Sequence, residues 1–179
     1  MYGISKDLTV NENNYFDGGI HNDVILEKVS YENVKKDGTG KMILAFHFKG
    51  SKGETFRHVE WPVEESDANM ETKIVNMGKR IKHILSKFVA EENIVIANVS
   101  TFEQYANEVK RIAGENYVGK TFEIKLIYDD KNNLGFPKYI GFIAKDKGTL
   151  KISATEKVTK ATATPNNDVA GFTPTTEAF

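Results

Sequence analysis

The chain has 179 residues, which is enough for one domain with a hydrophobic core but leaves little room for two. Its 24 Lys and Arg residues nearly balance 25 Asp and Glu residues, so the formal charge of -1 excludes a polycation that grips duplex DNA by bulk charge. The absence of cysteine excludes disulfides, thiolate zinc sites and cysteine nucleophiles.

The first residues of the chain do not read as a targeting segment. They lack both a basic start and an apolar core, and no apolar run approaches the roughly 20 residues that span a bilayer. We therefore expect a cytoplasmic protein that makes no contact with a membrane.

The first half of the chain predicts three antiparallel strands. After a polar, Asn-rich arm, residues 23–31 form a bent first strand, and Asp37-Gly38 supplies the turn that follows. Residues 42–50 alternate apolar and other side chains, as a half-buried strand does. The third strand lies over 55–63, and Pro62 marks its end because proline cannot donate to a ladder.

Two helices are expected next, because the spacing of the apolar residues changes to three and four. The stripe of the first helix consists of Ile74, Met77, Ile81, Ile84, Leu85 and Phe88. Ser100 and Glu103 make a capping box for the second helix, and Gly114 ends it. The second helix buries Phe102, Tyr105, Ala106, Val109 and Ile112.

Two further strands are predicted over residues 121–129 and 138–144. From Lys151 the composition becomes rich in Thr, Ala, Asn and Pro, which favours a flexible tail over 151–179 that ends in Phe179. The prediction is therefore a β-rich α+β domain over residues 1–150. Three strands, two helices and two strands is the element order of a five-stranded OB-fold barrel, and the short DGTG turn argues against a ferredoxin-like fold.

Four stretches of this chain resemble the single-stranded DNA-binding proteins of bacteriophages. They are GIHNDVILEKVSYE, DGTGKMILAFHFKG, YVGKTFEIKLIYD and the final TTEAF, and the resemblance covers residues 18–145 by element order. It implies an OB-fold protein that coats and protects single-stranded DNA in replication or recombination, in the host cytoplasm. It also implies a tail that meets replication or recombination proteins through Asp168, Glu177 and Phe179, although tails of this family cluster more acidic residues before the last Phe.

Binding a strand without reading its sequence requires cations for the phosphates and aromatic faces for the bases. The residues that offer these groups here are Phe56, Arg57, Trp61, Lys125, Tyr128, Lys131, Phe136, Lys138 and Tyr139. Strand alternation places Arg57 and Trp61 on one face and Phe56 on the other, so one set faces the core. Whether Trp61 is buried stays open, and Phe136 either stacks on a base or pins its loop to the barrel.

Enzymatic readings find no support in the sequence. The motifs HExxH, GxGxxG, GxSxG and SxxK are absent, and we expect no catalytic residues, metal or cofactor. A virion structural or assembly protein is the alternative, which the near-neutral charge favours. A carbohydrate-binding barrel is a third reading, which the lysines among the aromatic residues disfavour. A homo-oligomer through the edge strand is left open.

Overall fold

Alternating side chains in the first half of the chain build a three-stranded antiparallel ladder. The computed structural model describes residues 14–138 and 141–161. The ladder consists of β1 (Gly19–Asn33), β2 (Met42–Lys49) and β3 (Thr55–Glu60). Phe46 of β2 lies between Val29 of β1 and His58 of β3, and Phe48 pairs with Phe56. These side chains face inward, whereas His47 and Arg57, which pair with each other, face the opposite side.

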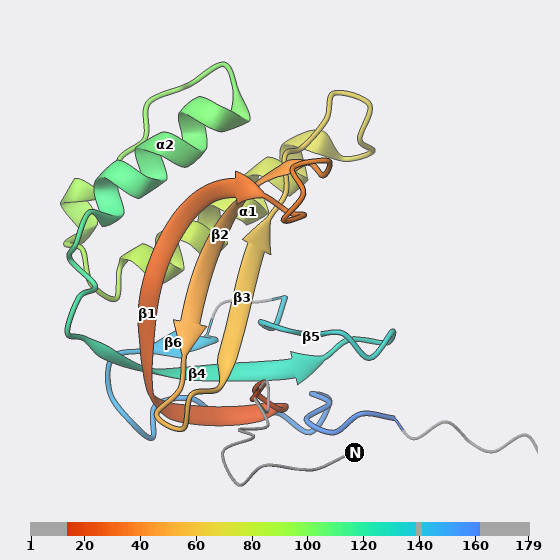
Figure 1. Ribbon diagram of the computed structural model, residues 1–179, viewed down its shortest axis with the longest axis vertical. Helices are drawn as coiled ribbons and strands as arrows, with labels where there is room; N and C mark the ends of the chain where they lie inside the picture. Colours follow the sequence, from red (N-terminus) through yellow and green to blue (C-terminus); the bar gives the residue numbers. More distant parts are fainter. Residues whose placement is uncertain (1–13, 139–140, 162–179) are drawn as a thin grey trace, which may run out of the picture.

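The first strand is longer than the sequence predicts because it belongs to two ladders. Its second half pairs with β2, and its first half pairs with β4 (Thr121–Tyr128). The register shifts between His21 and Val24 and again between Leu26 and Lys28, and such bulges bend a strand. Figure 1 shows the result: β1 curves strongly, and β4 runs crosswise to β2 and β3.

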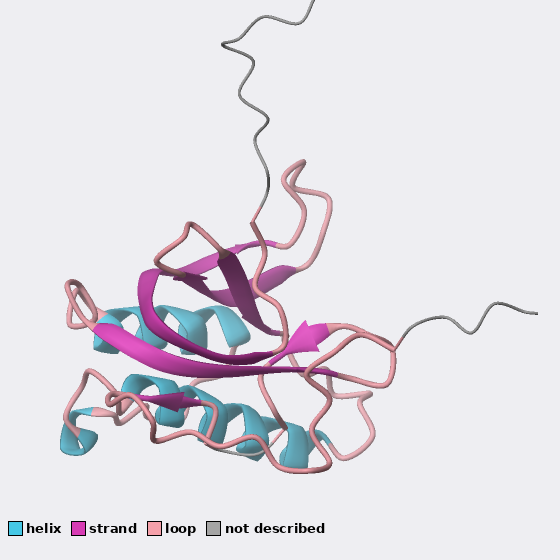
Figure 2. Cartoon of the chain, turned by 90° about the horizontal axis from the view of Figure 1, so that it is seen from below, coloured by secondary structure: helices cyan, strands magenta, loops and turns pink. Residues whose placement is uncertain are grey.

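Two helices between β3 and β4 close the inner side of the ladder, as predicted. They are α1 (Met70–Leu85) and α2 (Phe102–Ala113), separated by the short 3-10 helix η1 (Glu91–Asn93). In Figure 1, α1 passes behind the ladder and α2 lies beside the curved β1, and Figure 2 shows the two helices beside each other from below. Their apolar faces share one core with Leu26, Phe46 and Phe48.

Two details of the helices differ from the prediction. Ile74 is 45% exposed, because it lies near the start of α1, before the segment whose side chains enter the core. The N-cap of α2 is Thr101 rather than Ser100: its hydroxyl accepts the Gln104 N–H at 3.2 Å, and the Gln104 side chain accepts the Ser100 N–H at 3.1 Å. The sequence STFEQ contains two overlapping capping patterns, and the second forms the cap. Gly114 ends α2 as expected.

The end of the sheet differs most from the prediction. The expected strand over 138–144 is reduced to β6 (Ile143–Ala144), and a short β5 (Leu134–Gly135) forms in the preceding loop. The strand order is β3-β2-β1-β4-β5, with β6 also paired to β4. Within the described residues no ladder joins β3 to β5. Over the described residues the molecule is thus an α+β protein with an open antiparallel sheet.

Residues 151–161, which we expected to begin the flexible tail, make contacts along β4. The Lys157 carbonyl accepts the Tyr128 N–H at 2.7 Å, and the Ala161 N–H donates to Asn132 at 3.0 Å. The predicted tail residues Asp168, Glu177 and Phe179 lie outside the described residues. Neither α1 nor α2, nor any other helix of the described ranges, has the length and apolar character needed to cross a membrane.

Candidate functional site

A hollow of about 980 Å³, which we call the arm groove, is lined by residues of β2 and β3, among them His47, Phe48, Phe56 and Arg57. The arm residues Tyr15–Asp17 form one wall, because the Thr55 N–H donates to the Asn14 carbonyl at 2.9 Å and holds the arm beside β3. The loops 34–41 and 129–133 contribute the other walls. Among its lining residues are Tyr15, Lys36, His47, Phe56, Arg57 and Lys160.

A second hollow of about 450 Å³, the edge groove, lies between β3 and residues 134–138. The two grooves share Phe56 and Arg57, so they adjoin along β3. Five of the predicted binding residues line the edge groove: Phe56, Arg57, Trp61, Phe136 and Lys138. The structure therefore brings together side chains that are up to 82 positions apart in the sequence.

The aromatic residues of the grooves differ in what they can offer a ligand. Trp61, which follows β3, is 49% exposed, so this tryptophan lies at the surface and not in the core. Phe136 packs against Phe48, Phe56, His58 and Phe142, with ring centroids 4.4–5.5 Å apart. The reading in which Phe136 pins its loop to the sheet is therefore the one that the geometry favours.

Two predicted contact residues point away from solvent. Lys125 is buried in β4, where its ammonium group pairs with Glu156 at 2.7 Å and donates to the Lys151 carbonyl at 2.9 Å. Tyr128 is buried too, and its hydroxyl donates to Asp17 at 3.3 Å. The prediction missed this because both faces of β4 are covered, one by the core and the other by the segment after Leu150.

The remaining predicted residues lie at the surface or outside the described ranges. Lys138 is exposed at the rim of the edge groove. Lys131 is exposed in the turn 129–133, which the Asp129 side chain holds by accepting the N–H groups of Lys131 and Asn133 at 2.8 Å each. Tyr139 lies outside the described residues.

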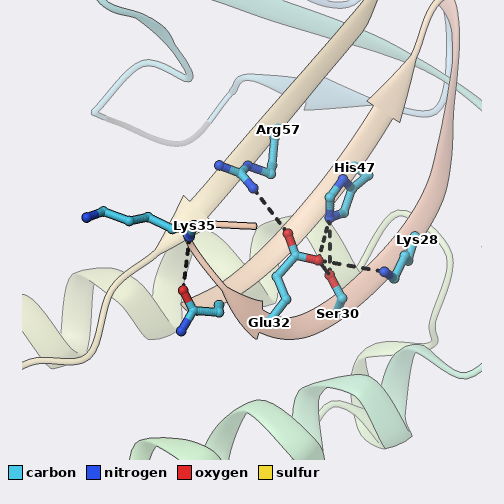
Figure 3. Close-up of polar contacts among 7 residues, drawn as sticks. Lys28, Ser30, Glu32, Lys35, His47 and Arg57 are labelled. Carbon is cyan, nitrogen blue, oxygen red and sulfur yellow. Dashed lines mark hydrogen bonds and ion pairs between the residues drawn. The ribbon is translucent and has the colours of Figure 1, made fainter. Parts of the chain in front are cut away.

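A polar cluster on the outer face of β1–β3 borders the arm groove (Figure 3). At its centre is Glu32, which accepts from Ser30 at 2.6 Å, from Arg57 at 3.2 Å and from His47 at 3.2 Å. Lys28 adds an ion pair at 3.6 Å. Burial alone would raise the pKa of the Glu32 carboxyl, but the Ser30 hydroxyl and the charges of His47 and Lys28 lower it below its usual value.

A second buried network supports the floor of the edge groove. Arg80 of α1 donates two hydrogen bonds of 2.6 Å to Glu60, and His58 adds a third contact at 3.0 Å. Burial opposes ionisation of Glu60, yet the bonds from Arg80 and His58 bring its pKa below the usual value. Arg80 thus joins α1 to β3 through its two hydrogen bonds to Glu60.

The sequence reading missed several residues of the grooves. Tyr15 is 71% exposed at the wall of the arm groove, and the only signal for it was an aromatic residue within an otherwise polar arm. Lys36 and Lys160 were missed because they lie in a turn and in the polar segment after Leu150, and the sequence does not indicate that these two segments line the same groove. His47, Lys28 and Glu32 share one face of neighbouring strands, which requires the register to be known.

A search with protein-family models finds none that matches this chain, and a comparison with curated proteins finds no match either. Chemically, the two grooves present cations (Lys36, Arg57, Lys138 and Lys160) beside exposed rings (Tyr15 and Trp61). Such a surface can neutralise phosphates and stack bases along an extended ligand.

Proposed function

We propose that this protein is a non-catalytic, bacteriophage-type single-stranded DNA-binding protein that coats and protects the strand during replication or recombination. The observation that carries the proposal is the pair of adjoining grooves along β3, which share Phe56 and Arg57 and place exposed rings beside cations. A continuous path of this kind suits a flexible polyanion better than a compact ligand.

An OB-fold is the finer description of the sheet that we propose. In OB-folds the ligand binds over the second and third strands, between the loops that join strands one to two and four to five. The arm groove has these boundaries, since the loops 34–41 and 129–133 line it over β2 and β3. Packing of Phe136 on Phe56 and Phe48 brings the β5 region to β3 in place of a ladder.

In the proposed mechanism, rings supply affinity that does not depend on base identity. Tyr15 and Trp61 stack on bases at the two ends of the path, and Phe56 forms the apolar floor between them. Arg57, Lys36, Lys138 and Lys160 neutralise phosphates. No reacting group is required, because the protein only holds the strand.

The proposal extends to the end of the chain, as the resemblance implies. Asp168, Glu177 and Phe179 would contact replication or recombination proteins of the same cell. Deletion of Phe179 should abolish co-purification with such an enzyme while single-stranded DNA binding persists. Co-purification that survives the deletion would remove Phe179 from this role.

The test of DNA binding is a titration of the full chain with a labelled oligo-dT of about 30 nucleotides, followed by fluorescence anisotropy. We expect tight binding at 50 mM salt that weakens at 200 mM, and much weaker binding to a duplex of equal length. No binding at low salt would contradict the proposal, and binding without salt dependence would indicate a carbohydrate-type site instead.

A virion structural or assembly role is the second candidate, and one observation favours it. An apolar hollow lies between the two helices, lined by Val63, Ile74, Val99 and Phe102. Ile74 and the neighbouring Val75 are exposed beside it, as at surfaces that contact other proteins. Failure of the oligo-dT titration would leave this candidate as the better one.

A further inference from the structure

The Glu32 cluster contains more donors than a structural carboxylate needs. Arg57, His47 and Ser30 all bond to Glu32, and Lys28 lies within ion-pair distance (Figure 3). These donors come from all three strands of the outer ladder, and two of them, Arg57 and His47, also line the arm groove. A guanidinium, an imidazole and a hydroxyl around one anionic group are also the donors that a phosphate attracts.

We propose that this cluster is a phosphate site of the DNA path and that the Glu32 carboxylate occupies it in the free protein. This inference rests on the proposed function, and it adds that Glu32 limits the affinity of the protein for single-stranded DNA. A DNA phosphate must take Arg57 from Glu32 before it can bind, and the two anions repel each other where they compete. Glu32 therefore weakens binding to single-stranded DNA and reduces the number of cations that the strand can neutralise.

The exposure of the cluster permits this exchange. The Glu32 side chain retains 23% of its accessible surface and that of Arg57 retains 41%, so both can change conformation without opening the core. The paired Arg80 and Glu60 differ, because the Glu60 side chain retains only 4%. Two donors of Glu32, Arg57 and His47, line the arm groove, so they are accessible to a ligand that lies in it.

The experiment compares the full-length wild type with Glu32→Gln and with the matched control Glu108→Gln. Glu108 is also held by an arginine, Arg111, at 2.8 Å, but it lies on α2, and Arg111 lines neither groove, whereas the Glu32 donor Arg57 lines both. Both variants change the net charge equally. Binding to labelled oligo-dT is measured by anisotropy between 50 and 200 mM salt, and circular dichroism verifies that each variant is folded.

We expect Glu32→Gln to bind about fivefold or more tightly than the wild type at 50 mM salt. Its salt slope should steepen by about 0.7 for each cation that it releases. Glu108→Gln should match the wild type, and adding Arg57→Gln to Glu32→Gln should cancel the gain. Wild-type binding with equal or weaker binding by folded Glu32→Gln would overturn this inference alone, whereas binding by neither protein would overturn the proposed function as well.

A measurement on the wild type covers the case in which Glu32→Gln does not fold. The side-chain carboxyl carbons of Glu32 and Glu108 are observed by NMR while oligo-dT is added. We expect the Glu32 signal to shift as its donors leave, and the Glu108 signal to stay in place. An unchanged Glu32 signal at saturating oligo-dT would contradict the exchange.

Discussion

At the scale of single residues, two aromatic side chains that line the edge groove differ in exposure and packing. Trp61 is exposed, whereas the Phe136 ring contacts four other aromatic rings. The sequence suggested that Phe136 binds a base and left Trp61 open. The structure favours Trp61 over Phe136 as the ring that is available to a base, because a ring that fills a core is not free to stack on a ligand.

Replacement of Trp61 by Ala should weaken oligo-dT binding by about 1 to 3 kcal/mol, because the variant loses a stacking surface. Its free energy of unfolding should change by only about 0.5 kcal/mol, since little packing is lost at the surface. Anisotropy and urea denaturation measure the two quantities. Trp61→Phe, which keeps a ring, should retain most of the affinity, and equal affinity of all three proteins would exclude Trp61 from the path.

Replacement of Phe136 by Ala should lower the free energy of unfolding by about 2 to 4 kcal/mol, because it leaves a cavity among four rings. Urea denaturation measures this loss, and Phe136→Leu should restore part of it. A stable Phe136→Ala variant with weakened DNA binding would instead support the role that the sequence suggested.

His83 should make the fold sensitive to acid. Its Nε2 accepts the Gly141 N–H at 3.2 Å, which requires a neutral ring, and burial together with the charge of Lys87 lowers its pKa to about 4. As the pH falls below the ordinary histidine value, the unfolded chain binds a proton that the folded chain does not. From about pH 6.5 to about pH 4, this residue should reduce the free energy of unfolding by up to about 1.4 kcal/mol per pH unit.

Urea denaturation at pH 7, 6 and 5 tests the histidine prediction. The variant His83→Gln keeps an acceptor for the Gly141 N–H but cannot be protonated, so its stability should fall less over this range. Identical pH profiles of variant and wild type would show that His83 does not contribute.

At the scale of elements, β4 is the strand that organises the molecule. It pairs with β1, β5 and β6, and its apolar side chains Phe122, Ile124 and Leu126 are buried as the alternation predicted. Glu123 on its other face is buried too, where it accepts the N–H groups of Gly148 and Leu150 at 2.6 Å each. Polar residues of β4 thereby hold the chain that follows β6, which an alternating pattern alone describes as a solvent face.

The variant Lys125→Met should therefore destabilise the fold by about 3 kcal/mol, because the largely buried Glu156 carboxylate loses the ammonium group that neutralises it. Hydrogen exchange within residues 153–161 should accelerate, and the double variant Lys125→Met/Glu156→Gln should recover part of the lost stability. The salt slope of DNA binding should not change. A slope reduced by about 0.7 in a stable variant would mean that Lys125 contacts a phosphate after all.

At the scale of the whole molecule, the end of the described chain lies at the candidate site. Ala161 is held by Asn132, and both Asn132 and Lys160 line the arm groove. The acidic residues Asp168 and Glu177 follow in the sequence within 16 positions of Ala161. An acidic tail that begins there can compete with DNA through unscreened electrostatics.

The double variant Asp168→Asn/Glu177→Gln should bind oligo-dT about two- to threefold more tightly at 50 mM salt, and the gain should disappear at 200 mM. The matched control is Glu91→Gln/Glu92→Gln, which makes the same charge change on exposed η1. Equal affinities of both double variants would exclude competition by the tail.

The amino-acid sequence by itself determined the order of β1–β3, the two helices and β4, the bend-prone first strand and most of the apolar stripe of each helix, because periodicity is a local property of the chain. It also selected Phe56, Arg57, Trp61 and Lys138, which do meet in one groove. Only the tertiary structure decided that Lys125 and Tyr128 are buried, that Phe136 packs inward and that Tyr15, Lys36 and Lys160 join the site. The physical reason is that exposure and neighbourhood depend on which segments cover a strand, and strand pairing over more than 100 positions sets that cover.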